Sequence, residues 1–236
     1  MNTLDPPMLV LLPGLDGTGK RLTCFIDALG EHVAHEIIGY PDGQPLGYEE
    51  LELRVREALP KDRPFVLLGE SFGGPIAMRI AATAPPGMVG VVLCGTFAKN
   101  PYRLLGWASP LICLFPLKSM PRWLRALLMW GSCDPGRAPA QSERAIAGLA
   151  AGVLRRRLSA LLSVDASERA RRITLPALIL YARHDRLVPY RATACLSSLM
   201  PHAELVAVDG PHLLLQAVPS ECAAVVTRFV SDLPRA

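Results

Sequence analysis

Continuous runs of hydrophobic residues alternate along most of the chain with segments that have apolar residues at helical spacing or many small residues. The hydrophobic runs predict short buried strands at about 8–13, 35–40, 65–68, 88–94, 175–182 and 204–208. The intervening segments predict helices at about 20–29, 48–59, 75–82, 191–200 and 220–233. Because strands and helices alternate, we expect an α/β fold, with a mostly parallel β-sheet covered by helices on both faces.

This alternation stops between residues 97 and 172, where no strand is predicted. The segment instead contains helical pieces separated by prolines at positions 101, 110, 116, 121, 135 and 139. A chain of 236 residues is long enough for one domain with an insertion. We therefore expect residues 1–96 and 173–236 to form the core, and residues 97–172 to form an inserted helical unit.

The motif Gly-Glu-Ser-Phe-Gly at residues 69–73 lies between a predicted strand and a predicted helix. A G-x-S-x-G motif in that context is typical of a nucleophile elbow, a tight turn that exposes the serine hydroxyl. Side chains at positions 69 and 73 would collide with the neighbouring strand and helix, which favours glycine at both. A random chain of this length contains the motif about one time in ten. Its placement, more than its occurrence, favours a nucleophilic Ser71.

An acid and a histidine follow later strands. Asp185 comes just after the strand that ends at residue 182, and His212 just after the strand that ends at residue 208. Loops that follow parallel strands lie at one edge of the sheet, so we expect Ser71, Asp185 and His212 at that edge. Serine is a good nucleophile only when a base takes its proton and an acid orients that base. The three residues therefore predict a Ser-His-Asp site.

The chain resembles the α/β-hydrolase superfamily, and within it the small serine carboxylesterases with a helical cap. The motifs that carry the resemblance are Leu-Pro-Gly-Leu-Asp-Gly-Thr-Gly at 12–19, the elbow at 69–73, and the loops of Asp185 and His212. The resemblance covers nearly the whole chain outside 97–172. It implies that this segment is a helical cap over the active site.

The same resemblance implies a role for each site residue. Ser71 would be the nucleophile, His212 the general base and then the general acid, and Asp185 the group that orients the imidazole. The backbone N–H groups of Leu15 and Phe72 would form the oxyanion hole. We expect the substrate to be a small-molecule carboxylic ester with a short to medium acyl chain.

Two alternatives remain at this stage. The first is an acyltransferase or thioesterase that uses the same triad on acyl-coenzyme A or acyl-carrier substrates. The stretch at 12–19 is similar to the opening of plastid acyltransferase/esterase proteins, which favours keeping this alternative. The second is a non-catalytic receptor that retains the fold as a ligand-binding domain, although an intact triad argues against it.

Two acidic residues near the motifs are not assigned to the reaction. An Asp-Gly pair most often makes a turn, so we favour a turn at Asp16 over a contact with substrate. Glu70 precedes the nucleophile, and we expect it to support the site by hydrogen bonding.

Basic residues are concentrated in the predicted cap. The whole chain has a net charge of +4, while the segment 97–172 carries thirteen basic and four acidic residues, a net charge of +9. A solvated outer face explains such a charge, and so does attraction to an anionic acyl carrier or lipid surface. No nucleic-acid recognition motif accompanies the charge, so nucleic acid is not an expected partner.

The sequence predicts neither a cofactor nor a metal site. It has no cluster with metal-ligand spacing, no G-x-G-x-x-G motif and no P-loop. The six cysteines contain no C-x-x-C pair, and no secretory signal pattern is present. The uncharged run at 104–117 is short and broken by prolines, so we expect no transmembrane segment. We expect free thiols and a cytoplasmic location.

Overall fold

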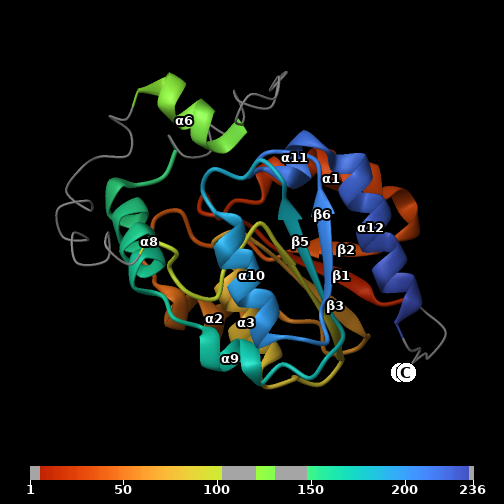
Figure 1. The fold of residues 1–236 in the computed structure, drawn as a ribbon. Helices are drawn as coiled ribbons and strands as arrows, with labels where there is room; N and C mark the ends of the chain where they lie inside the picture. Colours follow the sequence, from red (N-terminus) through yellow and green to blue (C-terminus); the bar gives the residue numbers. More distant parts are fainter. Residues whose placement is uncertain (1–5, 103–120, 131–147, 234–236) are drawn as a thin grey trace.

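A computed structural model describes residues 6–102, 121–130 and 148–233 of the chain (Figure 1). Six strands of this part form one sheet in the order β2-β1-β3-β4-β5-β6, and every neighbouring pair is parallel. The strands are β1 (Met8–Leu12), β2 (His35–Ile37), β3 (Phe65–Glu70), β4 (Met88–Cys94), β5 (Ala177–Ala182) and β6 (Glu204–Val208). The predicted parallel sheet is therefore confirmed.

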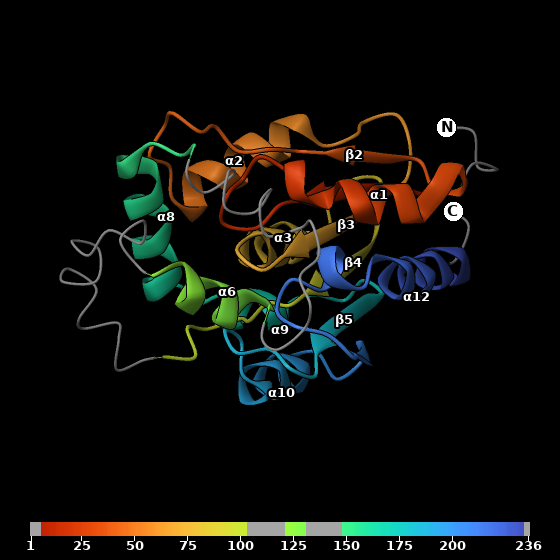
Figure 2. The same cartoon turned by 90° about the horizontal axis from the view of Figure 1, so that it is seen from above.

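Helices cover both faces of the sheet, as predicted (Figures 1 and 2). One face carries α1 (Thr23–Leu29), α11 (Leu214–Ala217) and α12 (Pro219–Asp232). The other carries α2 (Tyr48–Ala58), α3 (Gly73–Ala81), α9 (Ser167–Arg171) and α10 (Tyr190–Leu199). Two 3-10 turns, Lys20–Leu22 and Gly30–His32, flank α1. The short helix α11 was not predicted. Helix α9 lies in the segment 97–172, for which helical pieces were predicted, but it packs in the same layer as α2 and α3.

Strand β1 is apolar throughout because its side chains enter two cores. In β1, Val10 and Leu12 pack into the core beneath α2 and α3, whereas Leu9 and Leu11 pack into the core beneath α1 and α12. All four side chains are fully buried. A strand that is buried on both faces needs no polar positions, which explains the continuous hydrophobic runs of the sequence.

The strand order places a switch point between β1 and β3. The chain goes from β1 to β2 on one side, then returns to add β3, β4, β5 and β6 in turn on the other side. Helices that follow β1 and β3 therefore leave toward opposite faces, and the loops after these two strands separate at their carboxyl ends. Ligands of open α/β sheets bind in the crevice that forms there.

Helices α6 (Arg122–Trp130) and α8 (Ala151–Ser163) lie outside the two helical layers, with α6 beyond the carboxyl ends of the strands (Figure 1). Both belong to the predicted insertion. Residues 103–120 and 131–147 of that insertion lie outside the described part of the chain. Among the described helices, none is both long and apolar enough to cross a lipid bilayer.

Candidate active site

The turn after β3 holds Ser71 in a strained conformation. Its backbone φ is +48°, in the left-handed region that residues with side chains seldom adopt. A Cβ added to Gly69 would lie 2.7 Å from the carbonyl oxygen of Gly73, and one added to Gly73 would lie 2.6 Å from that of Leu12. Only glycine fits these two positions, so the tight turn depends on both, as the motif predicts.

A continuous chain of hydrogen bonds joins the serine, histidine and aspartate. Ser71 Oγ lies 3.0 Å from His212 Nε2, and His212 Nδ1 lies 2.7 Å from Asp185 Oδ2. The side chains of His212 and Asp185 are only 6% and 4% exposed. The other oxygen of Asp185 accepts the N–H groups of Leu187 and Val188, at 2.8 and 2.7 Å. An ionised carboxylate only accepts, so Nδ1 carries the imidazole proton and Nε2 accepts from the serine hydroxyl.

Two backbone N–H groups flank the serine at the switch point. Leu15 follows β1, and Phe72 lies at the N-terminal end of α3, where the helix dipole favours negative charge. Among the described residues, the structure records no acceptor for either N–H group. The fully buried ring of Phe72 stacks on Tyr48 at 4.6 Å and meets the edge of Tyr40 at 6.0 Å. These contacts fix the peptide that follows Ser71.

Glu70 connects three parts of the site. Its carboxylate accepts the N–H of Gly14 at 3.3 Å and the side-chain amide of Gln216 at 2.8 Å. The side chain is 3% exposed. Glu70 thus ties the loop after β1 to helix α11 and to the elbow itself. This is the supporting role that its position in the sequence suggests.

Asp16 organises the loop after β1. One carboxylate oxygen accepts the N–H and hydroxyl of Thr18, at 3.2 and 2.7 Å, and the other pairs with Arg21 at 2.6 Å. The N–H of Gly17 donates to the carbonyl of Gly14, which closes a turn. Burial acts to raise the pKa of Asp16, but Arg21 and Thr18 together hold it below its ordinary value. With both oxygens occupied, Asp16 acts as a turn-forming residue.

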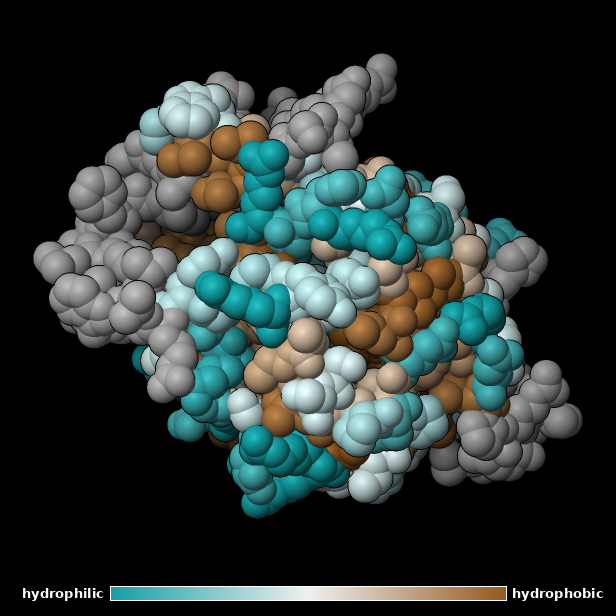
Figure 3. All heavy atoms as spheres, viewed as in Figure 1, coloured by the Kyte–Doolittle hydropathy of each residue, from teal (hydrophilic) through white to brown (hydrophobic). Residues whose placement is uncertain are grey.

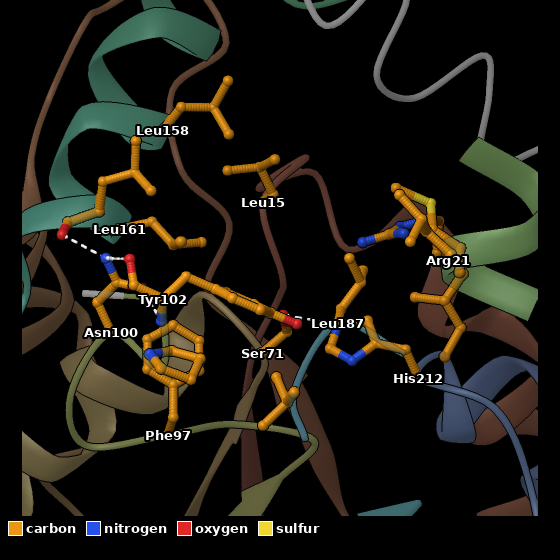
Figure 4. Close-up of a pocket in the computed structure, with 16 residues that line it drawn as sticks. Leu15, Arg21, Ser71, Phe97, Asn100, Tyr102, Leu158, Leu161, Leu187 and His212 are labelled. Atoms are coloured by element: carbon orange, nitrogen blue, oxygen red, sulfur yellow. Dashed lines mark hydrogen bonds between the residues drawn. The ribbon is translucent and has the colours of Figure 1, made fainter. Parts of the chain in front are cut away.

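A largely apolar cavity of about 250 Å³ opens above Ser71 and His212 (Figure 4). The core contributes Leu15, Leu187 and Val188 to its wall, and α6 and α8 contribute Leu128, Leu158 and Leu161. In Figure 4, Leu158 and Leu161 come from α8 on one side, while Leu187 and His212 come from the opposite side. The cavity thus combines residues from both parts of the chain.

Two polar residues of the site carried no recognisable sequence signal. Arg21 and Asn100 both line the cavity. The amide of Asn100 donates to the carbonyl of Leu162 at 2.7 Å, and its oxygen accepts the N–H of Tyr102 at 2.9 Å. Asn100 thus fixes the segment after β4 against α8. Asparagine is common in loops, so its position alone did not distinguish it.

Several basic residues of the insertion are paired with acidic residues or buried. Of those in the described part, Lys99 pairs with Asp165, and Arg156 pairs with Glu50 of α2. Arg171 and Arg172 both pair with Glu168. Arg157 is fully buried, so it adds nothing to the surface charge.

The fold and the geometry at its edge together define a class of protein. A parallel sheet with a serine elbow after β3, an acid after β5 and a histidine after β6 is the arrangement of an α/β-hydrolase. The model of the family described as Serine aminopeptidase, S33 matches residues 51–210. The chain belongs to this family of α/β-hydrolases. Among the described residues, no group of histidine, cysteine and acidic side chains is arranged to hold a metal ion.

Comparisons with individual proteins agree with this class. The pimeloyl-[acyl-carrier protein] methyl ester esterase of Xanthomonas oryzae is 25% identical over 247 residues, covering 97% of this chain and 96% of that protein. Phytyl ester synthase 1 of Arabidopsis thaliana is 40% identical over 84 residues, but this match covers 33% of the chain and 12% of that protein. The crystal structure of an enol-lactonase from Burkholderia xenovorans superposes with a TM-score of 0.82 at 17% identity, covering 98% of this chain and 94% of that one.

These relatives are hydrolases and ester-handling enzymes. Together with the family match they support hydrolase activity of the esterase kind for this chain. The structural similarity, at its low sequence identity, supports the fold.

Proposed function

We propose that the protein hydrolyses carboxylic esters through an acyl-enzyme formed on Ser71, with His212 as the base and Asp185 as the orienting acid. The observation that carries the proposal is the hydrogen-bond chain from Ser71 through His212 to Asp185 at the base of an apolar cavity. A serine on a strained turn, a buried histidine and a buried acid have no evident use in a merely structural loop.

The reaction follows from these contacts. His212 Nε2 takes the proton of Ser71 as Oγ attacks the ester carbonyl. The carbonyl oxygen becomes negatively charged, and the N–H groups of Leu15 and Phe72 stabilise it. When the intermediate collapses, the alcohol leaves with the proton that His212 holds. A water molecule, activated by the same histidine, then releases the acid and restores Ser71.

The cavity favours a short to medium acyl chain. Its volume of about 250 Å³ lies just below the usual range for small-molecule sites, and its wall is mainly aliphatic. We propose that residues 97–172 form the cap over the core of residues 1–96 and 173–236, since α6 and α8 supply part of the cavity wall. Figure 3 shows apolar surface gathered over α6.

An anionic acyl carrier or lipid surface is a candidate partner of the cap. The relative from Xanthomonas is named for an ester carried on acyl-carrier protein, and the basic segment is suited to an acidic partner. The ion pairs of Lys99, Arg156, Arg171 and Arg172 within the chain reduce the charge that is free for such a contact.

Replacing the nucleophile tests the central proposal. We expect Ser71→Ala to lower kcat for p-nitrophenyl butyrate at least about 1,000-fold, because the acyl-enzyme can no longer form. Ser198→Ala, which removes a hydroxyl from the surface of α10, should retain wild-type activity. A Ser71→Ala protein that folds and hydrolyses the ester at a near-normal rate would contradict the assignment.

Acyl transfer is the second candidate, favoured by the partial match to a protein named for ester synthesis. Hydrolysis and transfer share the acyl-enzyme and differ only in what removes the acyl group. Adding an alcohol in competition with water and analysing the products separates them, with a coenzyme A thioester as a parallel substrate. A non-catalytic receptor is distinguished by a fluorophosphonate probe, which should label Ser71 in the enzyme and fail to do so in a receptor.

A further inference from the structure

Arg157 is fully buried, although it belongs to a run of three arginines whose other members are exposed. The helical phase explains the difference. Val153, Arg157 and Ala160 are spaced three or four residues apart on α8, and all three are buried. Arg157 therefore occupies an apolar position of the helix and extends inward from it.

The guanidinium group binds three backbone carbonyl oxygens of the core. Nη1 donates to the carbonyls of Leu15 and Asp16, both at 2.9 Å, and Nη2 donates to that of Pro41 at 2.8 Å. The group also lies over the ring of Tyr40, 5.5 Å from its centroid. A Cβ at Gly17 would lie 2.5 Å from Nη1, so the loop after β1 is shaped around this guanidinium.

Arg157 is a buried cation without a counter-ion among the described residues. Within the described part of the chain, no ion pair includes Arg157, and its Nε has no hydrogen-bond acceptor. Burial lowers the pKa of Arg157, while Tyr40 and Asp16 act in the opposite direction. Removing a charge from water is unfavourable, and no acidic side chain that the structure describes pairs with Arg157 to offset that cost. Arg157 does satisfy three backbone carbonyl oxygens, so its hydrogen bonds stabilise the segments that carry them as well as fixing their positions.

Two of the three carbonyls that Arg157 binds belong to the loop that supplies one proposed oxyanion donor. Its hydrogen bonds to the carbonyls of Leu15 and Asp16 hold the two peptides that follow the N–H of Leu15. On the other side of that N–H, Glu70 accepts the N–H of Gly14. The donor thus lies between two fixed points. Glu70 belongs to the core, whereas Arg157 comes from α8, a helix of the insertion.

We infer that Arg157 is a positioning residue for the oxyanion hole, through which the seating of α8 on the core sets the orientation of the Leu15 N–H. The inference rests on the proposed function. An oxyanion donor must be aimed where charge develops, and an error of about 1 Å in such a group lowers a rate on the order of 100-fold. The loss of Arg157 should therefore reduce the rate of the chemical step more than the binding of substrate.

Three variants test this inference through steady-state kinetics. Arg157→Met retains most of the side-chain volume but donates no hydrogen bond, and we expect its kcat to fall by about 10- to 100-fold, with KM changed less than about threefold. Arg157→Lys can still donate to the carbonyls and should recover part of the loss. Arg156→Met removes the neighbouring surface arginine of the same helix and should match the wild type.

An inhibitor provides a readout that a purely structural role would not change. An alkyl trifluoromethyl ketone forms a hemiketal: Ser71 Oγ bonds to the ketone carbon, the serine proton goes to His212, and the ketone oxygen becomes an oxyanion. Its affinity should weaken in Arg157→Met by about the factor lost from kcat. The secondary alcohol of the same chain length only fills the cavity, so its affinity should remain within about threefold.

The outcomes separate this inference from the proposed function. Equal kcat in Arg157→Met and the wild type, or equal weakening of the ketone and the alcohol, would contradict the positioning role. If Arg157→Met does not fold, Arg157→Lys is compared with the wild type in the same way. A loss of affinity for the ketone but not for the alcohol would support the inference. Unchanged kcat and unchanged ketone affinity would overturn it. Failure of a fluorophosphonate to label Ser71 in the wild-type protein would instead contradict the proposed function.

Discussion

The backbone of Ser71, the proposed nucleophile, has a strained conformation. Its φ of +48° is unfavourable for any residue with a Cβ, and the hydrogen bond from its N–H to the carbonyl of Cys94 fixes it there. Besides Ser71, Ala84 is the other residue with a side chain that has positive φ in the described part of the chain, and it lies on the exposed surface after α3. The two positions share a conformation and differ in their surroundings.

We expect Ser71→Gly to be more stable than Ser71→Ala by about 0.5–1 kcal/mol. Glycine removes the strain of the left-handed backbone conformation, which is roughly 1–2 kcal/mol for a residue with a Cβ. It also loses more conformational entropy on folding than alanine does, which costs roughly 0.5–1 kcal/mol. Urea unfolding of the two inactive variants measures the difference. Ala84→Gly is the matched control, which should gain a similar amount and keep full activity. A Ser71→Gly protein no more stable than Ser71→Ala would show that the turn is not strained.

At the scale of elements, several charged side chains hold the loop between β1 and α1. Asp16 and Arg21 are 1% and 6% exposed, so their ion pair is shielded from water. Arg157 and Glu70 hold the same loop from α8 and from β3. The shape of the loop therefore depends on Asp16 and on three further ionisable side chains, Arg21, Glu70 and Arg157. The direction of the Leu15 N–H depends on the same contacts.

Replacing Asp16 by asparagine should destabilise the protein by about 3 kcal/mol at pH 7, because it leaves Arg21 buried without its counter-ion. The pKa of Asp16 is lowered in the folded protein, so ionisation favours folding. Its contribution is fully present above the ordinary pKa of 3.8 and disappears as pH falls through the lower folded value. The stability difference between the two proteins, measured by urea unfolding, should therefore shrink at pH 3. An equal difference at both pH values would contradict this account.

At the scale of the whole molecule, the described residues that line the cavity come from the proposed cap, which includes helices α6 and α8, and from the core. Leu161 enters it from α8, and Leu187 faces it from the loop after β5. A hydrogen bond of 3.5 Å from the N–H of Leu213 to the carbonyl of Met129 connects α6 to the histidine loop. Substrate size should therefore depend on side chains of the insertion, while the chemistry depends on the core.

Leu161→Phe should shift the preferred acyl chain to a shorter one, because the larger ring occupies part of a cavity of about 250 Å³. We expect kcat/KM for p-nitrophenyl hexanoate to fall about tenfold or more, with the value for the acetate changed little. Leu53→Phe, at an exposed position of α2, is the control and should leave the profile unchanged. An unaltered chain-length profile in Leu161→Phe would exclude this cavity as the acyl site.

Much of the fold and part of the candidate site could be predicted from the sequence, for a physical reason. Strands buried on both faces are largely apolar, so β4 was predicted at its observed limits. The elbow was predictable because Gly69 and Gly73 are required by contacts within a few residues of Ser71 or with the adjacent strand. Asp185 and His212 could be placed because loops after parallel strands must meet at one edge.

The sequence by itself determined the parallel sheet, the elbow and the three side chains at the sheet edge, since each depends on local spacing or on a general rule of topology. Only the tertiary structure decided which arginine of the run 155–157 is buried and which carbonyls it binds. A charged residue on a helix is normally solvated, and only the packing of α8 on the core turns Arg157 inward. The same packing formed the cavity, because its walls come from segments that are distant in the chain and brought together by folding.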